Sequence, residues 1–263
     1  MLSIAPKSPA YNLELYPSSD GKPMAENTEQ YRWIALIKEN LEVVLQGTES
    51  FIAADLLWYP EVAKPPAPAP SQAPDVMVVL GRPPGRRYSY QQWEEDNKAP
   101  QVVFEILSPS NKTKKGRQEM EAKFAFYQRY GVEEYYLYDP DALHAQAWIR
   151  QGKNLMPLDR LDQWVSPRLR IRFDWQLGQA LKLYTPDGSV FKTLVDLQAE
   201  VERERLEKER ERLEKERERL EKERERAEKE RERAEKERER AEKERLTAYL
   251  RSLGIDPDTI PRS

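Results

Sequence analysis

The feature that most constrains the fold is a short apolar stretch, Val102-Val103-Phe104-Glu105-Ile106-Leu107, which has a glutamate near its centre. Runs of this length and composition are typical of strands that are buried on both faces of a sheet. An ionised carboxylate in such a strand is costly unless a cation or a metal ion meets it. The stretch therefore predicts a central strand in which Glu105 has a positively charged partner.

A second carboxylate, Asp75, follows Pro74 and opens another apolar run that ends at Leu80. Acidic residues on neighbouring strands can converge on one point, so Asp75 and Glu105 are candidates for a shared site. Each residue also has a purely structural alternative. Asp75 could simply cap a turn, and Glu105 could form a buried ion pair with Lys123 that only stabilises the fold.

The residue types exclude several kinds of catalytic site. The chain has no Cys and one His, His144, which follows the loop Asp139-Pro140-Asp141. Thiol catalysis, disulfides and Cys/His zinc sites are therefore excluded, and a single loop histidine is more often solvated than catalytic. Any metal ion would have to be held by oxygen ligands, which suits Mg²⁺ or Mn²⁺.

Charge is distributed unevenly along the chain. Charged residues make up 35% of it, and residues 200–245 hold 19 of the 44 basic and 20 of the 47 acidic residues. The remaining 25 basic and 27 acidic residues leave the rest slightly acidic, which counts against nucleic-acid binding by bulk charge alone. One local basic cluster, Lys112, Lys114, Lys115 and Arg117, is either a phosphate-contacting patch or an ordinary solvated loop.

The chain order predicts one mixed α/β domain between two less regular ends. Residues 1–24 are expected to be loosely ordered, 25–192 to form the domain, 193–253 to form a charged heptad-repeat helix, and 254–263 to be a tail. A proline-rich surface connector, 60–74, is favoured over an SH3-type ligand. Within the domain, one helix is predicted over 26–45, with Asn27 or Thr28 as its cap, and another from the basic cluster to Tyr130, with Tyr127 on its apolar face and Gly131 as a left-handed cap. Strands are predicted over 50–59, 75–80, 101–107, 134–138, 145–150 and 169–173. Tyr88, Tyr90 and Trp93 could stack on bases, but a role in hairpin packing is favoured.

The C-terminal repeat optimises helix formation more than helix pairing. Its apolar residues recur every seven positions, and Glu-to-Lys pairs four apart, such as Glu204/Lys208, each add roughly 0.2–0.5 kcal/mol of helix stability. One apolar residue per heptad makes a poor coiled-coil seam. The pattern favours a solvated single helix from about Leu194 to Leu253, and a weakly self-associating coiled coil remains the alternative. The recurring residues are Leu206, Leu213, Leu220, Ala227, Ala234 and Ala241.

Three stretches, taken in order, resemble the Uma-two family. They are Ala73-Pro74-Asp75-Val76, the segment from Val103 to Ser110 that contains Ile106-Leu107-Ser108-Pro109-Ser110, and the segment from Lys123 to Tyr136. Members of this bacterial family are called "putative restriction endonucleases" of the PD-(D/E)XK superfamily. The resemblance covers roughly residues 25–190.

The resemblance implies a restriction-endonuclease-like fold, with a central mixed sheet flanked by helices and followed here by the long charged helix. It implies that Asp75 and Glu105 hold magnesium and that a lysine completes the catalytic set. The signature places this lysine two residues after the second acid, where this chain has Leu107, so Lys123 is expected to take the role. Glu26 or Glu29 is the expected acid of the first helix, and Lys112, Lys114 and Lys115 are the expected phosphate contacts.

Two functions from different classes follow from these residues. The first is a magnesium- or manganese-dependent endonuclease that hydrolyses phosphodiester bonds in DNA. The second is a catalytically degenerate domain that acts as a binding or scaffold module through its charged helix. No apolar run is long enough for a membrane span, and the N-terminus lacks signal-peptide features, so a soluble cytoplasmic protein without membrane contacts is expected. A weak homo-oligomer through the helix or the domain is a further expectation.

Overall fold

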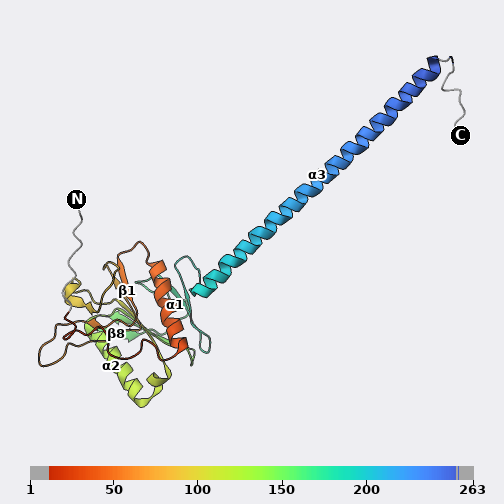
Figure 1. Cartoon of the computed structure of the whole chain (residues 1–263). Helices are drawn as coiled ribbons and strands as arrows, with labels where there is room; N and C mark the ends of the chain where they lie inside the picture. The colour runs from red at the N-terminus through yellow and green to blue at the C-terminus, as the bar shows by residue number, and fades with distance from the viewer. Residues whose placement is uncertain (1–11, 253, 255–263) are drawn as a thin grey trace, which may run out of the picture. The chain divides into compact units, whose positions relative to one another are not determined.

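The computed structural model describes residues 12–252 and Gly254, and the chain divides into two units, Met1–Thr193 and Leu194–Ser263. The first unit is built on a six-stranded sheet with the order β1-β3-β5-β6-β7-β8 (Figure 1). β5 and β6 pair in parallel, and the other neighbours are antiparallel. The strands are β1 (Ser50–Ala53), β3 (Val76–Leu80), β5 (Val102–Ile106), β6 (Glu134–Asp139), β7 (His144–Gln151) and β8 (Asn154–Pro157).

Helix α1 (Thr28–Val44) covers one face of this sheet. The helix begins where the Asn27 side chain accepts a hydrogen bond from the Gln30 N–H, as the sequence predicts. Its apolar stripe packs on the even-numbered side chains of β3 and β5, because alternate residues of a strand point to opposite faces. The stripe includes Ile34, Ile37 and Leu41, and the strand partners are Val76, Val78, Val102, Phe104 and Ile106.

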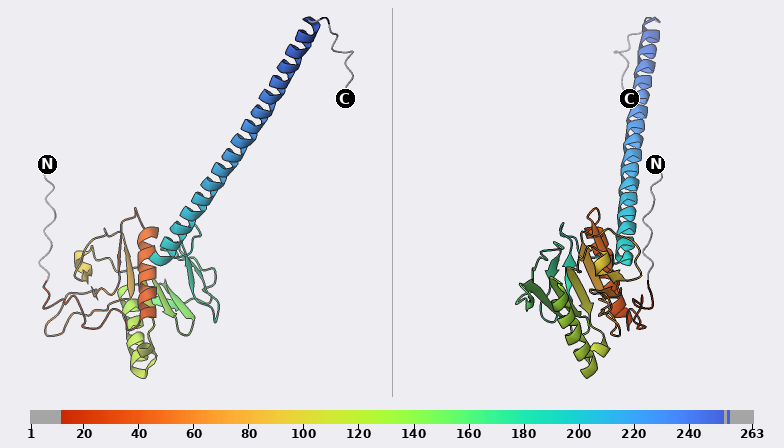
Figure 2. Two further views of the ribbon diagram at one scale, coloured as in Figure 1. Left: turned by 45° about the vertical axis from the view of Figure 1, so that its right-hand side comes forward. Right: turned by 90° about the vertical axis from the view of Figure 1, so that its left-hand side faces the viewer.

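Helix α2 (Lys114–Tyr130) covers the other face of the sheet (Figure 2). Its buried Tyr127 packs among the odd-numbered strand residues Met77, Val79 and Val103. The helix ends at Gly131, whose φ of 95° is the left-handed cap conformation that the sequence predicts. Glu105 is an odd-numbered residue, so its side chain belongs to the α2 face.

Smaller elements complete the first unit. β2 (Trp58–Tyr59) pairs with β4 (Tyr90–Gln91), and β9 (Arg172–Asp174) pairs with β10 (Lys182–Tyr184). Two 3₁₀ turns, η1 (Gln92–Glu94) and η2 (Pro109–Lys112), precede β5 and α2. Tyr90 is fully buried and Trp93 packs on Tyr16, so these aromatic side chains serve packing, the reading favoured from the sequence.

Two strand predictions need correction. The single strand predicted over 50–59 is wrong, because the chain bends between β1 and β2 at Asp55, which has a φ of 49°. The edge strand β8 was not predicted, since its residues Asn154-Leu155-Met156-Pro157 carry only one buried side chain and give a weak apolar signal. The predicted fold class, a mixed sheet flanked by helices and followed by a long charged helix, is confirmed.

The second unit contains one helix, α3 (Leu194–Ser252). It runs without interruption over the predicted range, apart from Leu253, which lies outside the described residues together with most of the predicted tail. Ion pairs four residues apart, such as Glu225–Lys229 and Glu232–Lys236 at 2.7 Å, line the helix. None of the helices among residues 12–252 combines the length and the apolar character that a membrane crossing requires.

We expect a peptide that spans α3 to be strongly helical on its own. Its helicity should decrease as salt is raised, because its Glu–Lys and Glu–Arg pairs are exposed and are screened by ions. Circular dichroism at low and high ionic strength measures this directly. A random-coil spectrum at low salt would contradict the expectation.

Candidate metal-dependent active site

The sheet register places the two predicted carboxylates opposite each other. β3 and β5 pair so that Val76 lies across from Phe104, and one further step sets Asp75 across from Glu105. Residues that face each other across antiparallel strands have Cβ atoms about 4.5–5.5 Å apart. A hydrogen bond of 2.6 Å from the Ile106 N–H to Asp75 Oδ2 ties the two strands together at this point. The predicted convergence of Asp75 and Glu105 is therefore a consequence of strand pairing.

Two side chains from α2 hold the Glu105 carboxylate. Lys123 Nζ lies 2.7 Å from Glu105 Oε2, and the Tyr127 hydroxyl donates to Oε1 at 2.5 Å. The two α2 residues are four apart, which places them on the same face of the helix. Glu105 is 2% exposed, so these contacts supply the positive and polar partners that its position in an apolar strand requires. The structure thus brings Asp75, Glu105 and Lys123 together.

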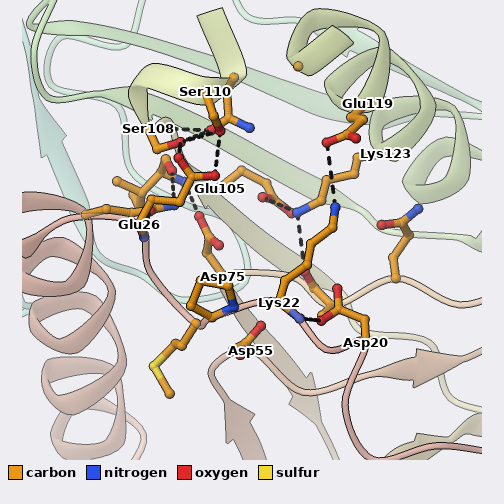
Figure 3. A pocket seen from close by; sticks show the side chains of 18 of the residues that line it. Asp20, Lys22, Glu26, Asp55, Asp75, Glu105, Ser108, Ser110, Glu119 and Lys123 are labelled. Atoms are coloured by element: carbon orange, nitrogen blue, oxygen red, sulfur yellow. Dashed lines mark hydrogen bonds and ion pairs between the residues drawn. The ribbon is translucent and has the colours of Figure 1, made fainter.

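These three residues line a pocket of about 360 Å³ between α2, the end of β5 and the segment before α1 (Figure 3). Sequence reasoning missed Asp55, another carboxylate that lines this pocket. Burial raises the pKa of Asp55, and the nearby Asp20 and Glu105 carboxylates add to the rise while Lys123 opposes it. The one indication of Asp55 in the sequence is its position as an acidic residue shortly after the apolar strand β1.

The electrostatics of the pocket are dominated by crowded carboxylates. Burial, and then the neighbouring Glu105, raise the pKa of Asp75 to about 8, although Lys123 and the Ile106 N–H act in the opposite direction. Burial lowers the pKa of Lys123, but the attraction of Glu105 and Asp75 outweighs it and leaves this pKa above its ordinary value. Lys123 therefore does not compensate the neighbouring acidic groups fully.

Gln30 links the first helix to the site. Its Nε2 donates to the Ile106 carbonyl at 2.9 Å, and its Oε1 accepts from the Glu26 N–H at 2.9 Å. Sequence reasoning missed this buried residue as well. The sequence contained an indication of it, because Gln30 is a polar residue in line with Ile34, Ile37 and Leu41 on the apolar stripe of α1.

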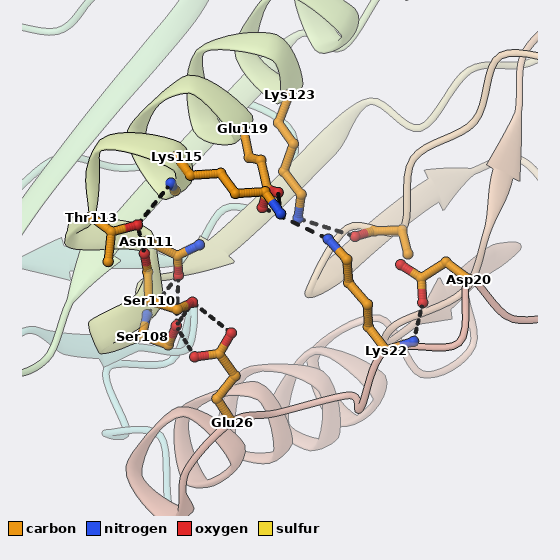
Figure 4. A network of polar contacts seen from close by, with 12 residues as sticks. Asp20, Lys22, Glu26, Ser108, Ser110, Asn111, Thr113, Lys115, Glu119 and Lys123 are labelled. Atoms are coloured by element: carbon orange, nitrogen blue, oxygen red, sulfur yellow. Dashed lines mark hydrogen bonds and ion pairs between the residues drawn. The ribbon is translucent and has the colours of Figure 1, made fainter.

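The two candidates for the first-helix acid lie in different places. Glu26 lines the pocket, and its carboxylate accepts hydrogen bonds from Ser110 at 2.5 Å and from Ser108 at 2.8 Å (Figure 4). These bonds lower the pKa of Glu26. Glu29 instead binds Arg32 and Trp33 on the surface of α1, away from the residues that line the pocket. Of the two candidates for the first-helix acid, Glu26 is therefore the one that lines the pocket, where it binds the serines of the turn after β5.

The basic cluster does not act as one patch. Lys112 lies between Asp139 and Asp141, with Nζ–O distances of 2.9 and 3.0 Å, and neither Lys112 nor Lys114 is among the described residues that line the pocket. Lys115 does line it. Lys112 thus does not line the pocket, and its ammonium group pairs with Asp139 at the end of β6 and with Asp141 in the turn that follows.

Comparison with known proteins agrees with this geometry. The model of the Uma2 family, described as "Putative restriction endonuclease", matches residues 20–177, more than half of the chain. The chain belongs to the Uma2 family. The matched range contains every residue of the pocket and excludes α3.

One similar solved structure is that of a "putative nuclease belonging to DUF820" from Anabaena variabilis ATCC 29413. The two chains share 16% sequence identity with a TM-score of 0.41, and the match covers 57% of this chain and 77% of the other. A search of curated proteins finds no match.

The oxygen donors of the Uma2 site suit a magnesium ion. Among residues 12–252, no three acidic or histidine side chains are grouped closely enough to form a metal cage by themselves. Mg²⁺ does not require such a cage, because it is commonly bound through one or two carboxylates, with water and substrate phosphates as its other ligands. Asp75 and Glu105 are the two carboxylates that would hold it.

We expect Asp75→Asn to stabilise the metal-free protein above neutral pH. The folded-state pKa of Asp75 is about 8, well above the ordinary value of 3.8, so the folded protein binds a proton that the unfolded chain has lost. The stabilisation of the folded state that this proton provides is fully present below about pH 4, and it is lost as the pH rises through about 8. The wild type should therefore lose stability relative to Asp75→Asn over this range, by on the order of 1 kcal/mol per pH unit.

Urea unfolding in EDTA at pH 5, 7 and 8.5 measures this difference. Adding Mg²⁺ at pH 8.5 should restore stability to the wild type and leave Asp75→Asn unchanged, because a ligand of the folded state stabilises it by linkage. A stability difference that does not change with pH would show that Asp75 titrates normally.

Proposed function

We propose that this Uma2 protein is a Mg²⁺- or Mn²⁺-dependent endonuclease that hydrolyses phosphodiester bonds in DNA. The observation that carries the proposal is the register of β3 and β5, which sets Asp75 opposite Glu105 while α2 directs Lys123 at the pair. Membership of a family described as restriction endonucleases supports it.

The chain's own residues divide the work at this site. Asp75 and Glu105 would hold the ion, which when bound lowers the pKa of a water ligand and offsets charge on the phosphate. Tyr127 and the Ile106 N–H fix the orientation of the two carboxylates. Lys123 is 22% exposed and reaches the pocket, so its ammonium group can contact the scissile phosphate as a point charge.

Lys123 has this role although the usual lysine position holds Leu107. Leu107 follows Glu105 by two residues and lies just beyond the end of β5, but its apolar side chain cannot supply a positive charge. Lys123 reaches the same carboxylate from the helix above it, four residues before Tyr127. A lysine supplied from α2 can thus place its charge beside the acidic pair.

We expect Lys123→Ala to slow DNA cleavage by about 10²–10³-fold, a loss in the range of removing one charged group that stabilises a transition state. Affinity for Mn²⁺ should be unchanged or higher, since the substitution removes a cation that competes for Glu105. Cleavage assays with Mg²⁺, Mn²⁺ and Ca²⁺, together with calorimetric titration of Mn²⁺, test both parts. Ca²⁺ should bind without supporting turnover, because it activates water less well and prefers a larger shell.

A matched control is Lys64→Ala, which removes an exposed lysine that lies outside the pocket and pairs only weakly with Glu61. It should retain full activity. If the wild type cleaves no DNA although it binds Mn²⁺ through Asp75 and Glu105, the degenerate binding module becomes the better description. If Lys123→Ala cleaves at the wild-type rate, the lysine only neutralises Glu105.

A further inference from the structure

α3 carries an apolar stripe whose leucine side chains are about half exposed. Leu206, Leu213 and Leu220 are 49%, 54% and 51% exposed, and Ala227, Ala234 and Ala241 continue the stripe at the same seven-residue spacing. Seven residues fall about 20° short of two full helical turns, so the stripe drifts slowly around the helix. Two helices that wind around each other with a left-handed supercoil keep such a stripe in contact.

The two edges of the stripe carry opposite charges. Each apolar residue is followed three positions later by Glu and four positions later by Arg, as in Leu206, Glu209 and Arg210. Positions i+3 and i+4 lie on opposite sides of residue i on a helix surface, so one edge is acidic and the other basic. The six pairs are Glu209/Arg210, Glu216/Arg217, Glu223/Arg224, Glu230/Arg231, Glu237/Arg238 and Glu244/Arg245.

Ion pairing within the helix is concentrated on the face opposite the stripe. The pairs Glu204–Lys208, Glu211–Lys215, Glu225–Lys229 and Glu232–Lys236 all lie there, because their lysines stand two positions after the apolar residues. Of the edge glutamates, Glu223 and Glu244 pair with arginines one turn earlier. By contrast, Glu209, Arg210, Glu216 and Arg217 form no ion pair with any described residue, so the edges beside Leu206 and Leu213 keep uncompensated charge.

We propose that α3 forms a parallel, in-register, two-helix coiled coil with a second copy of this chain. In a parallel pair related by a two-fold axis along the helices, the acidic edge of each helix faces the basic edge of the other on both sides of the stripe. Glu209 then lies beside Arg210 of the partner subunit. In an antiparallel pair, acidic edges face each other and basic edges face each other, which is unfavourable.

This assignment accounts for both features of the repeat. The Glu–Lys pairs keep the outer face soluble and helical, while the leucine stripe and its charged edges are complementary to a second copy. The seam is short of large apolar residues, with three leucines followed by alanines, so the dimer should dissociate on dilution and at high salt. The proposal concerns α3 alone and does not depend on nuclease activity.

Single cysteines test the orientation in the full chain, which has none of its own. Leu206→Cys and Ala241→Cys, each oxidised separately under mild conditions, should both give disulfide-linked dimers, because a parallel register pairs each residue with its own copy. Lys208→Cys, on the opposite face, is the control and should remain unlinked. In an antiparallel pair, residues 206 and 241 cannot both lie next to the same-numbered residue of the second copy. The proposal is overturned if only one of the two variants forms linked dimers, or if neither forms more than Lys208→Cys does.

Exchange of the edge charges tests the complementarity by sedimentation equilibrium at low salt. Glu209→Arg with Glu216→Arg should raise the dimer dissociation constant about tenfold or more, because four cross-helix pairs become repulsive. Adding Arg210→Glu and Arg217→Glu exchanges the edges and should restore the wild-type constant within about threefold. Circular dichroism verifies that each variant stays helical. The parallel pair is contradicted if the wild-type chain is monomeric at all concentrations. It is also contradicted if Arg210→Glu and Arg217→Glu do not restore dimerisation to the Glu209→Arg, Glu216→Arg variant.

Discussion

Glu105→Gln should abolish metal-dependent cleavage, with a loss of at least about 10³-fold, or about 4 kcal/mol of transition-state stabilisation. Glu105 lies opposite Asp75 in the sheet register and contacts both Lys123 and Tyr127. An amide of the same shape still accepts the Tyr127 hydrogen bond, but it binds a hard cation poorly. Affinity for Mn²⁺ should therefore fall with the activity, which separates this variant from Lys123→Ala.

The matched control for Glu105→Gln is Glu119→Gln. Glu119 lines the same pocket but is exposed on α2, where it contacts Lys22 and Lys115 at 3.7 and 3.8 Å. Cleavage and Mn²⁺ binding by the control should stay within about threefold of the wild type, since exposed ion pairs contribute little. Full activity in Glu105→Gln would mean that other residues, or a contaminant, perform the cleavage, and the nuclease proposal would then be dropped.

Gly116→Ala should destabilise the first unit by about 2 kcal/mol or more. Replacing glycine with alanine inside a helix normally stabilises it by up to about 1 kcal/mol. Here, the added Cβ would lie 2.2 Å from the Ser110 carbonyl oxygen and 2.5 Å from the Asn111 Cα, both backbone atoms that cannot rotate away. Either α2 or the η2 turn must move, and overpacking of this kind typically costs about 1–3 kcal/mol in addition to the lost propensity gain.

The displacement should also reach the pocket, because Ser110 of η2 and its capping residue Ser108 both bind Glu26. Urea unfolding of Gly116→Ala measures the stability, and Gln118→Ala, an exposed substitution two positions later in α2, is the control that should change it by less than about 0.5 kcal/mol. Equal stability of Gly116→Ala and the wild type would show that η2 yields easily at this contact.

The sequence was informative wherever one side chain conflicted with its local environment. Glu105 in an apolar strand was expected to be functional or paired, Asp75 at the start of another apolar run was a candidate for the same site, and both line the pocket. Helix boundaries were also predictable, because the Asn27 cap and the left-handed Gly131 cap depend on nearby residues only. The uninterrupted α3 follows from propensity and four-residue charge pairing, which are properties of the local sequence.

Tertiary structure decided which distant residues complete the site. The sequence predicted Tyr127 only as part of the apolar face of α2, but its hydroxyl donates a hydrogen bond to Glu105. Lys112 was a candidate phosphate contact in the sequence, and in the structure it forms ion pairs with Asp139, the last residue of β6, and with Asp141. Asp55 enters the pocket because the chain bends after β1. Each of these outcomes depends on which side chains the packed sheet and helices bring into contact, and that information is not present in spacing along the chain.

The division between the two sources has one physical cause. Burial of a charge in an apolar strand is visible in the sequence, because it is a conflict between neighbours in the chain, and it singled out Asp75 and Glu105. Compensation of that charge is a property of three-dimensional contacts. The sequence suggested Lys123 as a partner of Glu105, but the packing of α2 on the sheet is what brings Lys123 within 2.7 Å of Glu105 and adds Tyr127 as a second partner.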